Sequence, residues 1–276
     1  MRPKLTLTFA CLNQSAFTKK CLDSLLAAGV SKDQIVVVDN GSTDDTQSLL
    51  SEYEGINIII NRENLGCGVA WNQGILHRQT EWTVVMNNDV IVAPTTIEGL
   101  IDAADRANVQ LLCPAMVEGS DDYDIPKTLS QYSQKARNLF RNGHVHAVFM
   151  LIHTSVWRKT GFFRASPSLL GYEDTLFFND CKLQGISMGT TGSAWIHHYG
   201  SITQTAMKLE LGLDKKMGLG DRHNYRLLGK SRLRRKLEKY FIRKSLRDYE
   251  RREIDEIGLS LHGQKQPGMP INWTPR

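Results

Sequence analysis

Short apolar runs alternate with longer segments of helical period over roughly the first 110 residues of the chain. Several runs are rich in β-branched residues, as in Ile35–Val38, and are bounded by Gly, Asn, Ser or Asp, which is typical of buried strands. The predicted elements are strands beginning at Leu5 and at Gln34–Val38, Asn57–Ile60 and Trp82–Met86, and helices at Ser15–Ala28, Asp44–Tyr53, Gly68–Gln79 and Thr95–Ala107. This alternation indicates an α/β fold with a largely parallel sheet covered on both faces.

The pattern is weaker in the next hundred residues. Glu118–Arg141 is polar and ambiguous, and Ser120–Asp124 within it has the composition of a loop over a cleft. The apolar runs Ala147–His153 and Gly192–Ile196 predict core strands, and Ser155–Gly161 predicts a short helix.

The chain changes character near Ala206. From Asp214 through Arg252 there are 15 Lys and Arg against 5 Asp and Glu, an excess of 10, whereas the whole chain has a formal charge of +5. A basic amphipathic helix is predicted over Lys230–Ile257, because apolar residues recur there at helical spacing. These residues are Leu233, Leu237, Tyr240, Phe241, Leu246 and Tyr249. We therefore divide the chain into a main domain at 1–205, a basic, mainly helical appendage at 206–262 and a loose tail at 263–276.

Several roles are open for the basic helix. Its apolar stripe can dock on the main domain, or on a second subunit in a homodimer, while its charges form a solvated face. Its charges can instead contact an anionic acceptor or nucleic acid, or an anionic membrane surface.

The composition of the chain indicates how large a hydrophobic core it can build and in which cellular compartment it is expected. With 276 residues and 41% hydrophobic content, the chain can build one full core and an appendage. No apolar stretch approaches the ~20 residues that cross a bilayer, and the N-terminus has the pattern of a strand rather than of a signal peptide. The five cysteines lack metal-ligand spacing, and their odd number argues against a disulfide framework. We expect a cytoplasmic protein without a transmembrane segment, with peripheral contact at the inner membrane surface as one role of the basic helix.

Candidate chemistry lies where two predicted strands end. Asp39 follows Ile35–Val38, and Asn87-Asn88-Asp89 follows Trp82–Met86. Open α/β sheets bind nucleotides at the carboxyl ends of their parallel strands. Between the two strands, Asn64–Gly74 is rich in glycine and leads into a helix, an arrangement that favours phosphate. Taken alone, Asp39 is equally compatible with a solvated loop in which it caps a helix, and helices that pack tightly on sheets also often start with glycine.

The order of these motifs resembles glycosyltransferase family 2, the inverting nucleotide-sugar enzymes of GT-A fold, as far as about Thr205. Leu5–Asn13 is similar to the family's first strand and nucleotide loop, and Asn64–Gly74 fits its N-x-G-x-x-x-A-x-N-x-G segment. Asn87-Asn88-Asp89 stands at the DxD motif, and Gly171–Asp174 corresponds to the acidic pair on the acceptor side. The resemblance implies a Rossmann-like mixed, mainly parallel sheet flanked by helices, to which the basic appendage is added.

The resemblance also implies roles for individual residues. Donor nucleotide binding is expected of Ala10, Leu12, Asn13, Asp39, Asn40, Asn64, Gly66, Asn72, Asn87 and Asn88, and Asp39 is the acid that bonds uracil or a related base. The acceptor side is expected to contain Trp157, Gly171 and Tyr172. Asp174 is the expected general base, and Glu173 either orients it or binds an acceptor hydroxyl. Both acids also suit the N-terminus of a helix over Thr175–Leu183, and the two interpretations are compatible.

The predicted metal site departs from the family's pattern, because Asn87 replaces the first carboxylate of DxD. Asp89 is therefore the expected ligand of Mn²⁺ or Mg²⁺, which it would share with the donor's phosphates. His197 and His198 are further candidates, and at most one is expected to face the site because adjacent strand residues point to opposite faces. The alternative for both histidines is ordinary packing behind the strand.

The expected activity is metal-dependent transfer, with inversion, of a sugar from a UDP- or dTDP-sugar to an acceptor hydroxyl in surface polysaccharide or glycolipid assembly. Hydroxymethylated DNA bases are the alternative acceptor, since they would give the basic helix a direct role. The same scaffold also serves non-catalytic nucleotide or carbohydrate binders and nucleotidyltransferases. Ala10–Phe17 contains neither glycine nor a basic residue, which argues against a nucleotidyltransferase.

Overall fold

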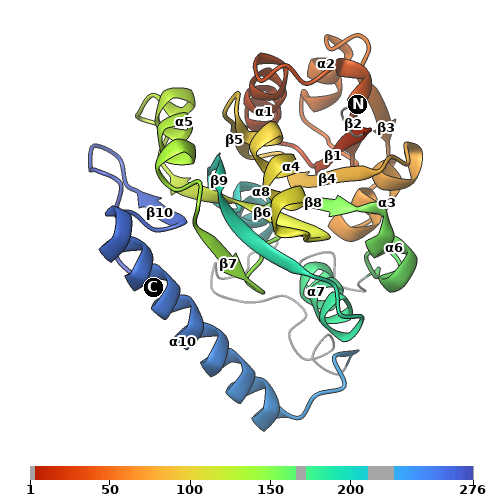
Figure 1. Ribbon diagram of the computed structural model, residues 1–276. Coiled ribbons are helices and arrows are strands. Elements are labelled where there is room, and N and C mark those ends of the chain that lie inside the picture. Colours follow the sequence, from red (N-terminus) through yellow and green to blue (C-terminus); the bar gives the residue numbers. More distant parts are fainter. Residues whose placement is uncertain (1–3, 166–171, 211–226, 276) are drawn as a thin grey trace.

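The computed structural model describes residues 4–165, 172–210 and 227–275, and its strands form one mixed sheet (Figure 1). The strand order is β3-β2-β1-β4-β8-β6-β9-β5, with β10 beside β6 and β7 beside β9. The strands are β1 (Leu5–Cys11), β2 (Ile35–Asp39), β3 (Asn57–Ile60), β4 (Trp82–Asn87), β5 (Val90–Val92), β6 (Leu111–Gly119), β7 (Phe140–Asn142), β8 (Phe149–His153), β9 (Met188–His198) and β10 (His262–Lys265). The helices are α1 (Ser15–Ala27), α2 (Thr46–Ser51), α3 (Cys67–His77), α4 (Thr96–Ala107), α5 (Ile125–Lys135), α6 (Thr154–Thr160), α7 (Glu173–Leu183), α8 (Ile202–Glu210) and α10 (Arg232–Ile257), with a 3-10 turn at Lys32–Gln34.

The N-terminal half of the sheet is parallel, and its register aligns the ends of the strands. Strand β1 lies between β2 and β4, with Cys11 opposite Asp39 and Ala10 opposite Asn87. The polar residues that end or follow these three strands therefore meet at one edge of the sheet.

The remaining strands are mixed in direction and return the chain to that edge. Strand β8 is antiparallel to β4 and β6, whereas β6 and β9 are parallel with a register shift between Pro114 and Ala115. The end of β9 pairs antiparallel with β5, which sets His198 opposite Val90. His198 thereby reaches the chain segment that follows β4, where Asp89 lies.

Two hydrophobic clusters cover the opposite faces of the sheet. Val84 belongs to the cluster that contains Leu22 of α1, whereas Val85 belongs to the cluster that contains Trp71 of α3. This division follows from the alternation of side chains along a strand. The fold-class prediction, a mixed and mainly parallel sheet flanked by helices with a C-terminal helical appendage, is confirmed.

The sequence did not predict every element. Strand β6 and helix α5 were not assigned, and both overlap or adjoin the ambiguous segment Glu118–Arg141. Strand β9 is also longer than the predicted Gly192–Ile196. The boundary drawn after residue 205 falls inside α8, which continues to Glu210.

The C-terminal region differs from the prediction in two ways. Helix α10 is present, but four residues of the expected apolar stripe are exposed, namely Leu233, Leu237, Tyr240 and Phe241. The helix docks through its second half, where Tyr249 packs on His144 and Glu253 pairs with Arg141. The loose-tail prediction is wrong for residues 263–265, because they belong to β10, which pairs with β6. Trp273 also packs against Trp195. Within the described residues, none of the helices combines the length and the hydropathy of a membrane span.

Candidate functional site

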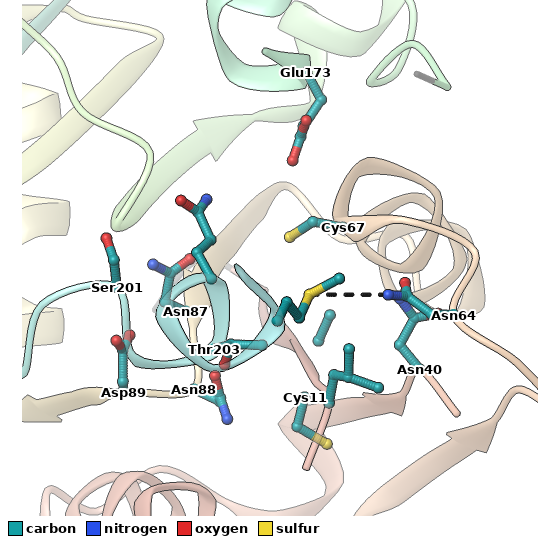
Figure 2. Close-up of a pocket in the computed structure, with 14 residues that line it drawn as sticks. Cys11, Asn40, Asn64, Cys67, Asn87, Asn88, Asp89, Glu173, Ser201 and Thr203 are labelled. Carbon is teal, nitrogen blue, oxygen red and sulfur yellow. Dashed lines mark hydrogen bonds between the residues drawn. The ribbon is translucent and has the colours of Figure 1, made fainter. Parts of the chain in front are cut away.

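A pocket of about 660 Å³ opens at the edge where β1 and β4 end (Figure 2). Eight of the residues expected from the sequence line it, and they come from β1, the segment after β2, the segment before α3, the end of β4 and the start of α7. They are Ala10, Leu12, Asn40, Asn64, Asn87, Asn88, Asp89 and Glu173.

Asp89 and His198 face each other at one side of this pocket. His198 Nε2 lies 3.3 Å from Asp89 Oδ1, and both side chains are buried. Neither atom has a hydrogen-bond partner among the described residues. Burial alone would raise the pKa of Asp89, but His198 and the Ile202 N–H outweigh burial and lower it. The carboxylate is therefore the stable form of Asp89 at neutral pH.

The donor set of these two residues fits a divalent cation. A buried carboxylate oxygen and a buried imidazole nitrogen without hydrogen-bond partners are atoms that Mn²⁺ or Mg²⁺ can take as ligands. In the part of the chain that the structure describes, no third His, Cys, Asp or Glu joins them in a metal-ligating cluster. The rest of the coordination shell would have to come from water and from the donor's phosphate oxygens.

The two residues before Asp89 have different surroundings. Asn88 is buried and donates from Nδ2 to Thr18 Oγ1 at 3.0 Å, so its amide is fixed to α1. Asn87 is half-buried at the end of β4 and lines the pocket. Asn87 is therefore the residue of the motif whose amide is more available to a ligand.

Asp39 is fully buried at the end of β2 and lies behind the pocket lining. Its Oδ1 accepts the Ser42 N–H at 3.0 Å, whereas Oδ2 has no hydrogen-bond partner among the described residues. Asn13 supports the same loop, because its Oδ1 accepts the Thr43 N–H at 2.8 Å. The unpartnered oxygen of Asp39 is a ready acceptor for a donor group of a nucleobase.

A network of amide side chains holds the segment between β3 and α3 against the end of β2. Asn40 donates to Asn64 Oδ1 at 2.9 Å and accepts from Asn61 at 3.0 Å, and Asn61 exchanges hydrogen bonds with Gln73. Gly41 permits this contact for two reasons. A Cβ at position 41 would lie 2.6 Å from the Glu63 carbonyl carbon, and the backbone of Gly41 has a φ of +87°, which side chains disfavour. Gly66, with φ of +87°, caps α3 and donates its N–H to Asn64.

The acidic pair begins helix α7 and is split between two environments. Glu173 is 7% exposed and points into the pocket, as Figure 2 shows. Burial raises the pKa of Glu173 to about 7. Asp174 is not part of the lining, and its Oδ1 accepts the Thr175 N–H at 2.6 Å. Burial also raises the pKa of Asp174, but the hydrogen bonds from Thr175 oppose this change.

Some predicted site residues lie elsewhere. Asn72 pairs with the backbone of Phe163, donating to its carbonyl at 2.7 Å and accepting its N–H at 3.0 Å. Trp157, predicted on the acceptor side, does not line the pocket and is buried in the core, where it stacks with Phe177. His197 points away from Asp89 and lies 2.9 Å from the Tyr123 hydroxyl through Nδ1.

Tyr172 caps α7 with a left-handed backbone (φ +79°), and Gly171 lies outside the described residues. The predicted alternation of the two histidines agrees with this geometry, since only His198 faces Asp89.

The sequence analysis missed the wall that helix α8 supplies. The Ile202 N–H donates to Asp89 Oδ2 at 3.2 Å. Met207 Sδ lies 4.0 Å from Asn64 Nδ2, the contact that the dashed line marks in Figure 2. Helix α8 thus contacts both sides of the pocket. The lining residues not foreseen are Cys11, Cys67, Ser201, Thr203, Gln204 and Met207. The sequence does carry a signal for α8, because Ile202, Ala206 and Leu209 recur at helical spacing after a serine.

Comparison with known proteins places this site in a family. The model of the family described as "Glycosyl transferase family 2" matches residues 8–166. An uncharacterized glycosyltransferase of Rickettsia typhi is 26% identical over 173 residues, which cover 59% of this chain and 54% of the relative. The succinoglycan biosynthesis protein ExoO of Rhizobium meliloti is 30% identical over 111 residues, 40% of this chain and 32% of the relative. The chain thus spans about half the length of the first of these relatives and less of the second.

A solved structure extends the likeness beyond the sequence match. The mannosyltransferase PcManGT from Pyrobaculum calidifontis, in complex with GDP-Man and Mn²⁺, superposes with a TM-score of 0.56 at 18% identity. The alignment covers 76% of this chain and 61% of that protein. At this identity the likeness supports the GT-A type of fold and nothing finer.

Proposed function

The chain belongs to glycosyltransferase family 2, and from this premise we propose that it moves a sugar from a nucleoside diphosphate sugar to an acceptor hydroxyl with inversion and with a bound divalent cation. The glycosyltransferase activity follows from the family. The observation that carries the finer proposal is that one pocket receives Asp89 from one side and Glu173 from another (Figure 2). Such a pocket brings a candidate cation ligand and one member of the acid pair, Glu173, within one ligand's reach, and Asp174 follows Glu173 at the start of α7.

The proposed donor is a UDP- or dTDP-sugar. Uracil and thymine each present an imide N–H, and the buried, unpartnered Oδ2 of Asp39 is a matching acceptor. Asn40 and Asn64 line the adjoining part of the pocket and are held in place by their mutual hydrogen bond. Backbone groups of Ala10 and Leu12 would border the same nucleotide.

The proposed cation site is Asp89 with His198. A cation bound there would supply charge neutralisation to the diphosphate as it departs. Asp89 is kept ionised by its neighbours, so it is ready to hold the cation at neutral pH. PcManGT, a structural neighbour, was solved with Mn²⁺, which supports a divalent cation here without choosing between Mn²⁺ and Mg²⁺.

Asp174 and Glu173 have different roles in this proposal. Asp174, whose carboxylate is favoured by the hydrogen bonds from Thr175, removes the proton from the acceptor hydroxyl. The acceptor oxygen then bonds to the anomeric carbon as the bond from that carbon to the diphosphate oxygen breaks on the opposite face. Glu173, with a pKa of about 7, is partly protonated at neutral pH and donates a hydrogen bond to a hydroxyl of the bound sugar.

The proposed acceptor is a growing polysaccharide or a glycolipid. The support is the similarity to ExoO, a protein named for succinoglycan biosynthesis. Because that similarity covers 40% of this chain, it bears on the class of acceptor and not on its sugars.

A nucleotide-sugar panel tests the proposal. UDP-, dTDP- and GDP-sugars would be screened for thermal stabilisation and slow hydrolysis with Mn²⁺, with Mg²⁺ and with a chelator. The Asp89→Ala variant is measured in parallel, and Asp121→Asn serves as a control because Asp121 binds Lys20 and Tyr199 outside the pocket. We expect one donor to stabilise the wild type and the control only with metal. Stabilisation by every donor without metal, or by none, would contradict the proposal, and the anomeric configuration of the product, read by NMR, tests inversion.

A further inference from the structure

Helix α10 presents an apolar face that the main domain does not cover. Leu233, Leu237, Tyr240 and Phe241 are 69%, 50%, 61% and 61% exposed. They stand at positions i, i+4, i+7 and i+8, so they share one side of the helix. We call these four residues the α10 stripe.

The α10 stripe points away from the contact that fixes the helix. Arg141 binds Glu253 through two hydrogen bonds of 2.7 and 2.5 Å, and the His144 ring packs on Tyr249 with centroids 5.4 Å apart. At about 100° per residue, Tyr249 and Glu253 lie about 160–200° around the helix from Leu233. The docked side and the α10 stripe are therefore opposite faces, and the same helix can hold both contacts at once.

Positive charge flanks the α10 stripe. Between Lys230 and Arg247 the sequence has nine Lys and Arg against one acid, Glu238. That acid is already engaged by Lys230 at 3.0 Å and by Arg234 at 3.3 Å. Lys236, Arg243, Lys244 and Arg247 surround Tyr240 in one hollow of the surface. Apolar residues and cations thus occupy the same exposed surface.

We propose that the α10 stripe and its flanking cations bind the surface of an anionic lipid bilayer, with α10 lying in the plane of the interface. Leu233, Leu237 and Phe241 would enter the boundary between headgroups and acyl chains, while Tyr240 has the amphipathic ring favoured at that depth. The flanking Lys and Arg would contact lipid phosphates, and each cation near such a surface adds to binding. This attachment does not depend on catalysis, so an inactive enzyme would bind equally well.

Two other occupants fit the observations less well. A second copy of α10 would oppose its nine cations to nine more. The exposed acids of its second half, Asp248, Asp255 and Glu256, are too few to offset them, and Glu250 and Glu253 are buried in the chain's own fold. A nucleic acid would satisfy the cations, but its phosphates offer nothing to Leu233 and Leu237. A bilayer with anionic headgroups is the partner that matches both the apolar residues of the α10 stripe and the cations that flank it.

Vesicle flotation tests the proposal with the full chain. The protein is mixed with phosphatidylcholine vesicles or with phosphatidylcholine–phosphatidylglycerol vesicles, at low and high salt. We expect flotation with the anionic vesicles only, weakened by salt. Leu237→Ser combined with Phe241→Ser should reduce the bound fraction at least about tenfold, because it removes two apolar groups from the buried face. Arg243→Gln combined with Lys244→Gln should reduce it and also reduce its dependence on salt.

The controls separate binding from misfolding and from other partners. Leu183→Ser removes an exposed leucine on α7, 73% exposed, and should leave flotation unchanged. Circular dichroism and the Tm of each variant should match the wild type, since the substituted side chains are exposed. Equal binding to neutral vesicles would overturn the proposal. So would a lipid-free dimer that the double serine variant dissociates, or binding to duplex DNA in place of vesicles.

Discussion

His198 Nε2 lies 3.3 Å from Asp89 Oδ1, and strand pairing brings these two residues together across 109 positions of sequence. The pairing of His198 with Val90 sets β9 beside the chain that has just left Asp89, and the Tyr199 N–H donates to the Asp89 carbonyl at 3.0 Å. The contact is therefore built by backbone hydrogen bonds and persists without a ligand. A cation would enter a site that is already formed.

This geometry predicts graded losses of metal affinity. Asp89→Ala should abolish measurable Mn²⁺ binding in the presence of UDP, because it removes the only carboxylate of the proposed site. His198→Ala should weaken it by about 10–100-fold, since one ligand and the orienting contact of Asp89 are lost. Titration followed by the electron paramagnetic resonance of free Mn²⁺ measures both. Asp121→Asn is the control, and unchanged affinity in Asp89→Ala would place the cation elsewhere.

The acid pair predicts two different defects. Asp174→Asn should lower kcat by about 10²–10⁴-fold and leave donor affinity nearly unchanged, because the base acts on the acceptor. Glu173→Gln should lower kcat less and weaken donor binding, since Glu173 lines the pocket. Steady-state kinetics with calorimetric donor titration separates the two. If Glu173→Gln shows the larger loss in kcat with intact donor binding, the base is Glu173.

Stability should depend on the protonation of Glu173. Its pKa rises to about 7 in the fold from an ordinary value of 4.5, so the folded state binds this proton more tightly than the unfolded state does. The associated stability is present below about pH 4.5 and is lost as the pH rises to about 7. Glu173→Gln, which is neutral, should therefore stabilise the metal-free protein at pH 8 by on the order of 2–3 kcal/mol, and should change little at pH 4.5. Urea unfolding at both pH values measures this, with exposed Glu81→Gln as the control. Equal effects at the two pH values would contradict it.

The sequence predicted the strands that end at the pocket because each is a continuous buried apolar run, and a strand's last residue fixes what lies at the edge of the sheet. Asp39 and Asp89 were located in this way. The sequence could not show that the Asn88 amide would also bind the Thr18 hydroxyl, because that contact depends on the packing of α1 against the end of β4. Nor could the sequence show that Trp157 would pack in the core beside Phe177, because an aromatic residue has the same pattern in the wall of a site and in a core.

Other elements lacked a local signal. Strand β6 contains Pro114, which normally argues against an interior strand. The proline is accommodated because the pairing with β9 shifts register directly after it. Strand β10 is the polar sequence His-Gly-Gln-Lys, and backbone pairing with β6 rather than side-chain burial defines it. In the first half of α10 the apolar residues Leu233, Leu237, Tyr240 and Phe241 are exposed, whereas in its second half the acids Glu250 and Glu253 are buried. This arrangement is the reverse of what an amphipathic sequence usually predicts.

The Arg141–Glu253 pair should anchor the C-terminal region. Both side chains are almost fully buried, and the Ser260 hydroxyl and the Leu261 N–H also donate to Glu253. Arg141→Met should destabilise the protein by about 3–5 kcal/mol, because it leaves a buried carboxylate without its cation. Arg164→Met at the more exposed Arg164–Asp180 pair should cost less than about 1 kcal/mol. Denaturant unfolding compares the two, and similar losses would contradict the anchoring role.

The contact between Gly74 of α3 and Thr8 of β1 predicts the effect of adding a single methyl group at position 74. Gly74 faces Thr8 on β1, and a Cβ at position 74 would overlap the Thr8 hydroxyl, whose neighbours are fully buried. Gly74→Ala should therefore destabilise the protein by about 1–3 kcal/mol even though alanine favours helices. Thr8→Ala removes the overlapped hydroxyl, so the double variant should recover part of the loss. Measuring the Tm of the two single variants and of the double variant shows whether the loss is recovered. Additive losses in the double variant would show that the helix moves away from the sheet instead of pressing on Thr8.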